Sequence, residues 1–209
     1  MASDEPALRA SLLQAYLREI ARETPDDLGA VREALGAEAI ARIEHDPGHG
    51  WLPIALEMTI LRAVHARRGD EGVLELGRVM GHVAMRHALL RIVGEVSLVM
   101  SGRRPQAVLE FTLRGWEKAT QNAGVPKLVM RGPREAVIRL APVPEPLRHR
   151  ALFVRLGGSV EATLGELCRV SATSAVELDP GWSWADTVFR WLPRDEGRAT
   201  PRAAAAGRG

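Results

Sequence analysis

Four side chains of types that bind metal ions stand close together in the stretch EHDPGH. They are Glu44, His45, Asp46 and His49, and their carboxylate and imidazole groups are ligands for zinc and iron. The Pro-Gly pair inside the stretch favours a tight turn, which would bring these groups together. The spacing matches no established metal motif, and polar residues beside Pro-Gly also compose ordinary surface turns. Two interpretations follow: a metal-dependent enzyme that takes its acid–base pair from this cluster, with His45, Asp46 and His49 as ligands, or a turn without chemistry.

Other residue types that carry chemistry are sparse. His82 and His87 are five positions apart, so on a helix they face about 140° apart and cannot share one ion. The single cysteine, Cys168, excludes an internal disulfide and any zinc site that needs two thiolates. The chain has no GxSxG, and Gly157-Gly158 is not part of a phosphate-binding GxxxxGK[ST] loop. We therefore expect no catalytic residues of a recognisable kind.

Aromatic residues give the candidates for a binding pocket. Trp182 and Trp184 follow Pro180-Gly181, too close to a turn for regular strand positions. They either close an open end of the core or line the mouth of an apolar pocket. Two further aromatic residues stand in a segment with helical character. The candidate pocket residues are Phe111, Trp116, Trp182 and Trp184.

The sequence pattern predicts that the first two thirds of the chain are mainly helical. Apolar residues recur every three to four positions over 7–22, which predicts an amphipathic helix. A short helix ending near Gly36 follows Thr24, and Pro53 suits the first turn of a helix that runs to about Arg67. The stretch 73–100 is apolar on most of its circumference. A further helix is expected over 107–124, with Gly124 as its C-cap.

The last third changes in character. Two β-rich runs flank the turn at 131–134 and predict a hairpin, a helix is expected over 147–168, and strands are expected over 169–179 and 185–193. In the last strand, alternation places Phe189 and Trp191 toward the core and Val188 and Arg190 on the opposite face. The prediction is one α+β domain over 1–193, in which an N-terminal helical part packs on a small antiparallel sheet (hairpin, helix, hairpin). The Arg/Ala/Gly-rich segment 194–209 is expected to be disordered.

The amino-acid composition and the charge limit the classes of partner that we expect for this chain. The chain has 209 residues, 46% of them hydrophobic and 26% charged, which is typical of globular proteins. The net charge is +2, and residues 194–209, with four arginines against two acids, account for all of it. Elsewhere acids and bases alternate, which argues against a nucleic-acid partner. No signal peptide or membrane span is predicted, so we expect a cytoplasmic protein.

Three stretches carry a resemblance to a known superfamily. They are LGRVMGH at 76–82, GxxVExxLGELC at 157–168 and AxTVFRW at 185–191. With the order helix, strand, loop, strand at the end, the chain resembles the superfamily of four-vinyl-reductase domains, heme nitric-oxide-binding-like domains and small TRAPP subunits. Within it, the chain most resembles a paralogous set of myxobacterial proteins of about 200 residues. The resemblance covers about 10–193.

The heme-binding members of that superfamily raise the question of a cofactor. Either His82 or His87 alone could be a proximal ligand, but those members also hold the heme propionates with a Tyr-x-Ser-x-Arg motif. The only tyrosine here is Tyr16, in QAYLREI. We therefore expect no cofactor.

The resemblance and the lack of a catalytic motif favour a non-enzymatic sensory or regulatory module. Such a module would bind a small apolar ligand, a protein partner, or both. The broad apolar surface of 73–100 also predicts a homodimer, since a helix that is apolar all round must be covered on all sides. Gly81 and Met85 are the expected contact positions between the two copies.

Overall fold

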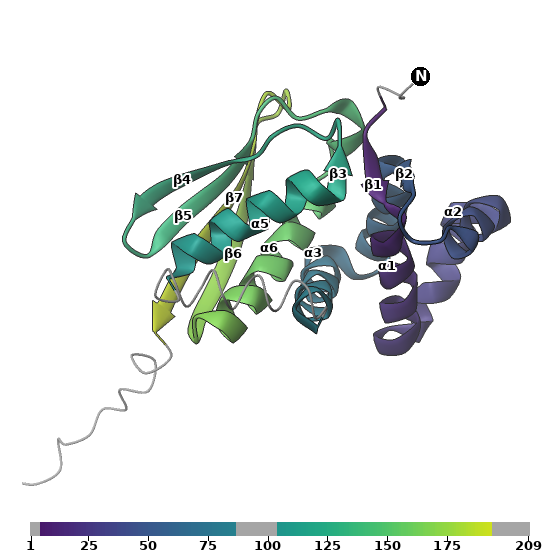
Figure 1. The fold of residues 1–209 in the computed structure, drawn as a ribbon, viewed down its shortest axis with the longest axis horizontal. Coiled ribbons are helices and arrows are strands. Elements are labelled where there is room, and N and C mark those ends of the chain that lie inside the picture. The colour runs from purple at the N-terminus through teal and green to yellow at the C-terminus, as the bar shows by residue number, and fades with distance from the viewer. Residues whose placement is uncertain (1–4, 87–103, 194–209) are drawn as a thin grey trace, which may run out of the picture.

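The computed structural model describes residues 5–86 and 104–193 (Figure 1). The N-terminal half consists of helices α1 (Ala10–Glu23), α2 (Pro25–His45) and α3 (Ile54–Arg86). After α5 (Pro105–Ala119) the chain forms the strands β4 (Lys127–Gly132) and β5 (Glu135–Leu140). A short helix, η1 (Glu145–Leu147), leads to α6 (Arg150–Leu167) and the strands β6 (Val170–Leu178) and β7 (Ala185–Pro193). The α+β prediction is confirmed.

Both predicted hairpins form and join into one antiparallel sheet. The strand order is β4-β5-β7-β6, so β5 and β7 lie at the centre. Phe189 and Trp191 of β7 are buried on the inner face, as expected. Of the two residues expected on the opposite face, Val188 is buried and Arg190 is exposed. The outer face carries an ion-pair network in which Arg139 donates two hydrogen bonds of 2.7 Å to the buried Asp186.

Three very short strands form a second sheet that the sequence did not predict. β1 (Ala7–Arg9) lies between β2 (Trp51–Pro53) and β3 (Thr120–Gln121), antiparallel to both. The first helix therefore begins at Ala10, three residues later than its apolar pattern indicated. Pro53 ends β2, and α3 begins at the next residue. Because Thr120 pairs with Leu8, α5 ends at Ala119 and not at Gly124.

Two of the helices are longer than predicted and bend at glycines. α2 continues past Gly36, which has a φ of 76°. α3 joins the two predicted segments through Gly69, whose φ is 64°. In these left-handed conformations a side chain would be strained, so glycine is the residue that permits the bends. Of the helices in the described ranges, none is long and apolar enough to span a membrane.

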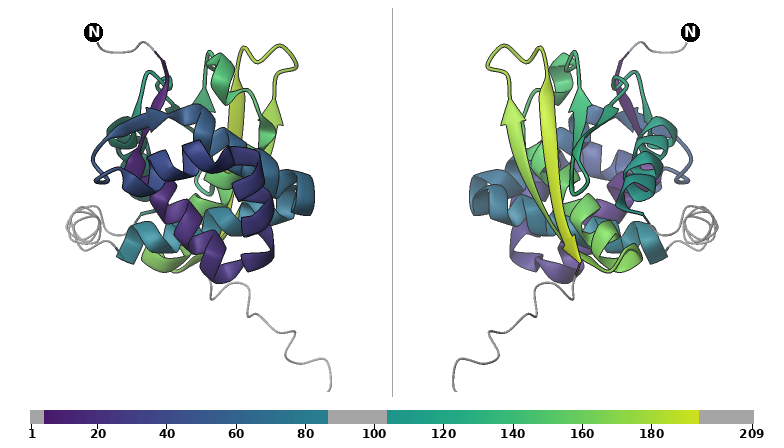
Figure 2. Two further views of the ribbon diagram at one scale, coloured as in Figure 1. Left: turned by 90° about the vertical axis from the view of Figure 1, so that its right-hand side faces the viewer. Right: turned by 90° about the vertical axis from the view of Figure 1, so that its left-hand side faces the viewer.

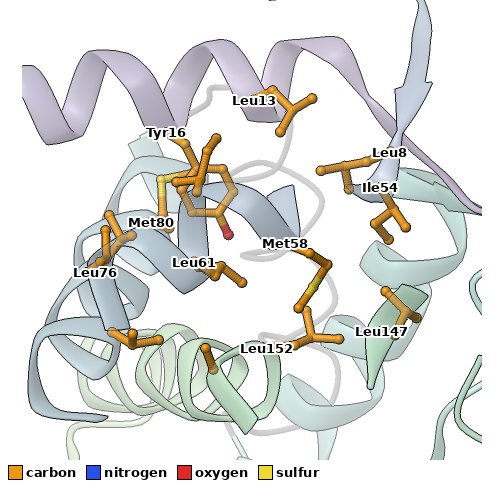
Figure 3. Close-up of a cluster of buried hydrophobic side chains, with 14 of the residues drawn as sticks. Leu8, Leu13, Tyr16, Ile54, Met58, Leu61, Leu76, Met80, Leu147 and Leu152 are labelled. Carbon is orange, nitrogen blue, oxygen red and sulfur yellow. The ribbon is translucent and has the colours of Figure 1, made fainter. Parts of the chain in front are cut away.

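The elements pack in layers from the sheet to the N-terminal helices. α5 and α6 cover the inner face of the sheet, α3 lies against the other side of α6, and α1 and α2 form the far layer (Figures 1 and 2). The core between α1, α3 and the start of α6 includes Met58, Leu61 and Leu152, and Tyr16 reaches into it from α1 (Figure 3). α5 contacts α6, β3 and β4, and a space remains between α5 and the facing sides of α1, α3 and α6.

Candidate ligand cavity

A cavity of about 360 Å³ lies between α5 and the facing sides of α1, α3 and α6. Its volume falls within the range of small-molecule sites in proteins. The space exists because two helices present small residues to it. On α5 these are Thr112, Gly115 and Ala119, at helical spacing, and on α6 they are Ser159 and Thr163. No described atom lies within 4 Å of the position that a Cβ on Gly115 would occupy.

Most of the buried wall is apolar. Met80 and Met85 come from the last turns of α3, Leu156 comes from α6, and Phe111 and Trp116 come from α5. The other side of α5 uses Val108 and Leu109 to pack against the sheet. One helix thus presents an apolar face to the core and an apolar face to the cavity.

A buried polar triad interrupts the apolar wall. The hydroxyl of Tyr16 donates to Glu57 Oε1 at 2.9 Å, and Arg155 Nη2 donates to the same oxygen at 2.7 Å. Among the described residues, Glu57 Oε2 and Arg155 Nε have no hydrogen-bond partner. Burial raises the pKa of Tyr16 well above its usual value, so the phenol stays a neutral donor. The triad therefore contains one negative and one positive charge, which cancel.

The hydroxyls of three threonines in the wall are already engaged. Thr112, Thr120 and Thr163 each donate to the carbonyl oxygen four residues earlier, at 3.0, 2.9 and 2.8 Å. These bonds are local to their helices. No histidine, which would serve as their base, is among the lining residues that the structure describes.

The four aromatic candidates separate into two places. Phe111 and Trp116 lie in the cavity wall. Trp182 instead packs on Phe153 with 6.3 Å between ring centroids, and the guanidinium of Arg139 lies 5.4 Å from the ring of Trp184. Neither of these tryptophans lines this cavity. Trp182 is partly buried and packs against the main core cluster.

The EHDPGH stretch forms a turn whose polar groups bind the backbone. Asp46 Oδ1 accepts hydrogen bonds from the backbone N–H groups of Gly48 and Gly50, and His45 Nδ1 lies 2.7 Å from the carbonyl oxygen of Ala41. Glu44 pairs with Arg32. Within residues 5–86 and 104–193, no group of three or more metal-binding side chains is close enough to hold an ion. Of the two interpretations of this stretch, the geometry of the described residues, His49 included, favours the turn over the metal cluster.

Gly81 and Met85 have roles inside a single chain. A Cβ on Gly81 would collide with the carbonyl oxygen of Ser159, so this glycine sets the close approach of α3 and α6. Met85 is buried and lines the cavity. The close contact expected between two copies is thus made within one. Self-association itself stays a prediction, which light scattering tests.

The polar triad of Tyr16, Glu57 and Arg155 was not predicted from the sequence. Glu57 and Arg155 each stand alone within apolar stretches, LEMTIL and FVRLGG, and a charged residue on an otherwise apolar helical stripe is the signal that could have found them. Their pairing could not be read in the same way, because they are separated by 98 positions.

The arrangement of layers and strands defines an α+β fold of the H-NOX type. The structure of a mutant H-NOX protein from K. algicida in the Fe(II) unliganded form matches with a TM-score of 0.63 and 10% identity, over 91% of this chain and all of that one. An H-NOX protein from S. oneidensis in the Fe(II)NO state matches with a TM-score of 0.54 and 10% identity, over 88% and 99% of the chains. No protein-family model matches the chain, and the search of curated proteins found no relative.

At this identity the comparisons establish the fold. They show the fold that the expected superfamily implies, and nothing in them bears on the narrower resemblance to myxobacterial proteins. The iron in those structures makes heme the group to test against this cavity.

The residues of the cavity wall do not fit heme. Iron in heme is held by histidine, cysteine, methionine or tyrosine. Met80 and Met85 do line the cavity, but methionine holds heme iron together with a histidine. Neither histidine nor cysteine occurs among the described lining residues, and the Tyr16 hydroxyl is committed to Glu57. His82 is at the surface, where Nδ1 lies 3.1 Å from Glu166, and His87 lies outside the described residues. The fold is shared, but the donor set for a histidine-ligated iron is not present in the described wall.

Proposed function

We propose that this chain is a non-enzymatic sensory or regulatory module that binds a small, mainly apolar ligand in the cavity between α5 and α1, α3 and α6. The observation that carries the proposal is the cavity itself, of about 360 Å³, with Phe111, Trp116 and Leu156 in its wall. Burial of apolar ligand surface contributes roughly 25 cal/mol per Å², which favours such a ligand without any covalent or metal bond.

The fold supports a ligand-binding role. The two H-NOX structures compared above are named for an iron state, Fe(II) in one and Fe(II)NO in the other. For this chain we carry over the use of the interior as a binding site and not the iron, because the described wall has no histidine or cysteine and its tyrosine hydroxyl is engaged by Glu57. A protein partner would distinguish the ligand-bound from the ligand-free form by contact with α5, because α5 borders both the cavity and the sheet.

Binding is tested with a neutral fluorescent probe, N-phenyl-1-naphthylamine, and a variant that fills the cavity. Gly115→Leu extends a side chain into the open space beside Gly115, so saturable one-to-one probe binding by the natural chain is expected to be lost. Gly29→Leu is the matched control, because Gly29 also has no described atom within 4 Å of an added Cβ, on a helix remote from the cavity. Equal probe binding by both variants would place the ligand elsewhere and contradict the proposal.

A further inference from the structure

We infer that the ligand of this cavity is an amphiphile with an anionic head group, whose apolar part fills the interior while its charge stays at the mouth. This inference rests on the proposed function and adds the chemical class of the ligand. It comes from the distribution of charge along the cavity wall.

The described wall contains three cations and one anion. They are Arg9, Lys118, Arg155 and Glu57. Arg155 and Glu57 form a buried ion pair at 2.7 Å, so their charges cancel at the deep end. The uncompensated charge of the described wall is therefore that of Arg9 and Lys118, and both are positive.

These two cations belong to the exposed end of the cavity. Arg9 ends β1, Lys118 is in the last turn of α5, and the pairing of Leu8 with Thr120 brings these two segments side by side. Lys118 is exposed and Arg9 is half-buried, whereas Met80, Met85 and Leu156 are buried in the interior. The wall thus changes from cationic at the mouth to mainly apolar inside, where the Glu57–Arg155 pair has no net charge.

The guanidinium of Arg9 is held in place before any ligand arrives. It lies 3.9 Å from the ring centroid of Trp51, and Nη1 donates to the carbonyl oxygen of His49 at 2.7 Å. The remaining N–H groups of this fixed fork suit a carboxylate or a phosphate oxygen. Lys118 is in the last turn of α5, where the helix dipole stabilises a positive charge. The positive charge at the mouth therefore comes from Arg9 and Lys118 together.

The sign of the charge selects among amphiphiles of equal length. An anionic head meets two cations at the mouth, a cationic head is repelled by them, and an uncharged head gains only the apolar contacts. A carboxylate, a sulfate or a phosphate head satisfies this requirement equally, because the discriminating property is the negative charge.

The test compares decanoate with decan-1-ol by displacement of the neutral probe at pH 7.5. Decanoate is expected to bind more tightly, although the alcohol is the more apolar compound. Lys118→Gln is expected to weaken decanoate binding about two- to fivefold, the range for one solvent-exposed ion pair, and to leave decan-1-ol binding unchanged. Lys127→Gln is the matched control, because Lys127 is the other lysine of the chain, is exposed on β4 and does not line the cavity.

Three results separate the two proposals. If decan-1-ol binds as tightly as decanoate, or if Lys118→Gln weakens both equally, the anionic head group is overturned while the apolar cavity stands. If the probe binds and neither compound displaces it, the ligand class is likewise wrong. If neither the probe nor either compound binds, the proposed function itself fails.

Discussion

At the scale of single residues, the pairing of Glu57 with Arg155 is the most consequential contact around the cavity. Both side chains leave water on folding, and only their mutual hydrogen bond and that of Tyr16 offset the loss of hydration. A buried pair of this kind is sensitive to removal of one partner, because the charge that remains is uncompensated.

Arg155→Met is therefore expected to lower the free energy of unfolding by about 3–5 kcal/mol, as measured by urea denaturation. The double variant Glu57→Leu, Arg155→Met is expected to lose less than the sum of the two single variants, since it leaves no isolated charge. Additive losses, or a loss below about 1 kcal/mol for Arg155→Met, would show that the pair is not buried in solution.

A second residue-scale feature is the cap of α6. His149 Nδ1 accepts a hydrogen bond of 3.2 Å from the backbone N–H of Ala151, and that bond requires an unprotonated nitrogen. Burial, with Arg62 and His65 nearby, lowers the pKa of His149 below 6.5, and only Asp70 opposes the shift. The ring of His65 lies at 5.5 Å, so protonation would also place a cation beside it.

Because the pKa of His149 is lower in the folded state, the unfolded chain takes up the proton first as the pH falls. The stabilising contribution of neutral His149 is thus complete above pH 6.5 and is lost as the pH falls from there through the folded-state pKa. His149→Asn keeps a good N-cap without a titrating group, so its stability is expected to fall less than that of the natural chain between pH 7.5 and 5.5. Identical pH profiles in urea denaturation would contradict this assignment.

At the scale of the elements, the close approach of α3 and α6 holds the two halves of the molecule together. A Cβ on Gly158 would overlap the carbonyl oxygen of Leu74, and one on Gly77 would overlap that of Arg155. The glycines of both helices are therefore required by backbone contact, and their low helix propensity is offset by the packing that they permit.

Gly158→Ala is expected to destabilise the fold by about 1–3 kcal/mol, because α3 and α6 must separate to admit the methyl group. Gly29→Ala is the control: it adds the same methyl group on α2, where no described atom lies within 4 Å, and is expected to stabilise by about 1 kcal/mol. Thermal unfolding of both variants measures the difference. A stabilised Gly158→Ala variant would show that the two helices are farther apart in solution.

The elements that sequence reasoning found are those with a local signal. β6 and β7 showed alternation over nine residues each, and α6 showed a helical period over eighteen. β1, β2 and β3 have three residues or fewer, too short for any period. Their pairing also joins positions such as Leu8 and Thr120, far apart in the sequence. The cavity could not be predicted for the same reason. Its small residues on α5 and α6 are far apart in the sequence, and only the folded structure shows that they face a common space.

At the scale of the whole molecule, a shared fold is combined with a different interior chemistry. The layers match H-NOX structures over about nine tenths of the chain, but the described cavity wall contains neither histidine nor cysteine. Function depends on the site more than on the architecture that carries it. The cavity therefore favours binding driven by apolar burial, in a fold shared with the Fe(II) and Fe(II)NO structures reported above.

Titration of the purified chain with hemin tests whether this cavity binds heme. We expect no saturable Soret band, because the described wall has no histidine or cysteine to hold the iron, alone or beside Met80 or Met85, and the Tyr16 hydroxyl is held by Glu57. The neutral probe is expected to bind with unchanged stoichiometry when hemin is present. A saturable one-to-one Soret band that disappears in Tyr16→Phe, Met80→Leu or His87→Ala would identify an axial ligand and overturn the expectation. A band that persists in all three variants would be compared with Gly115→Leu, since only heme inside the cavity is displaced by filling it.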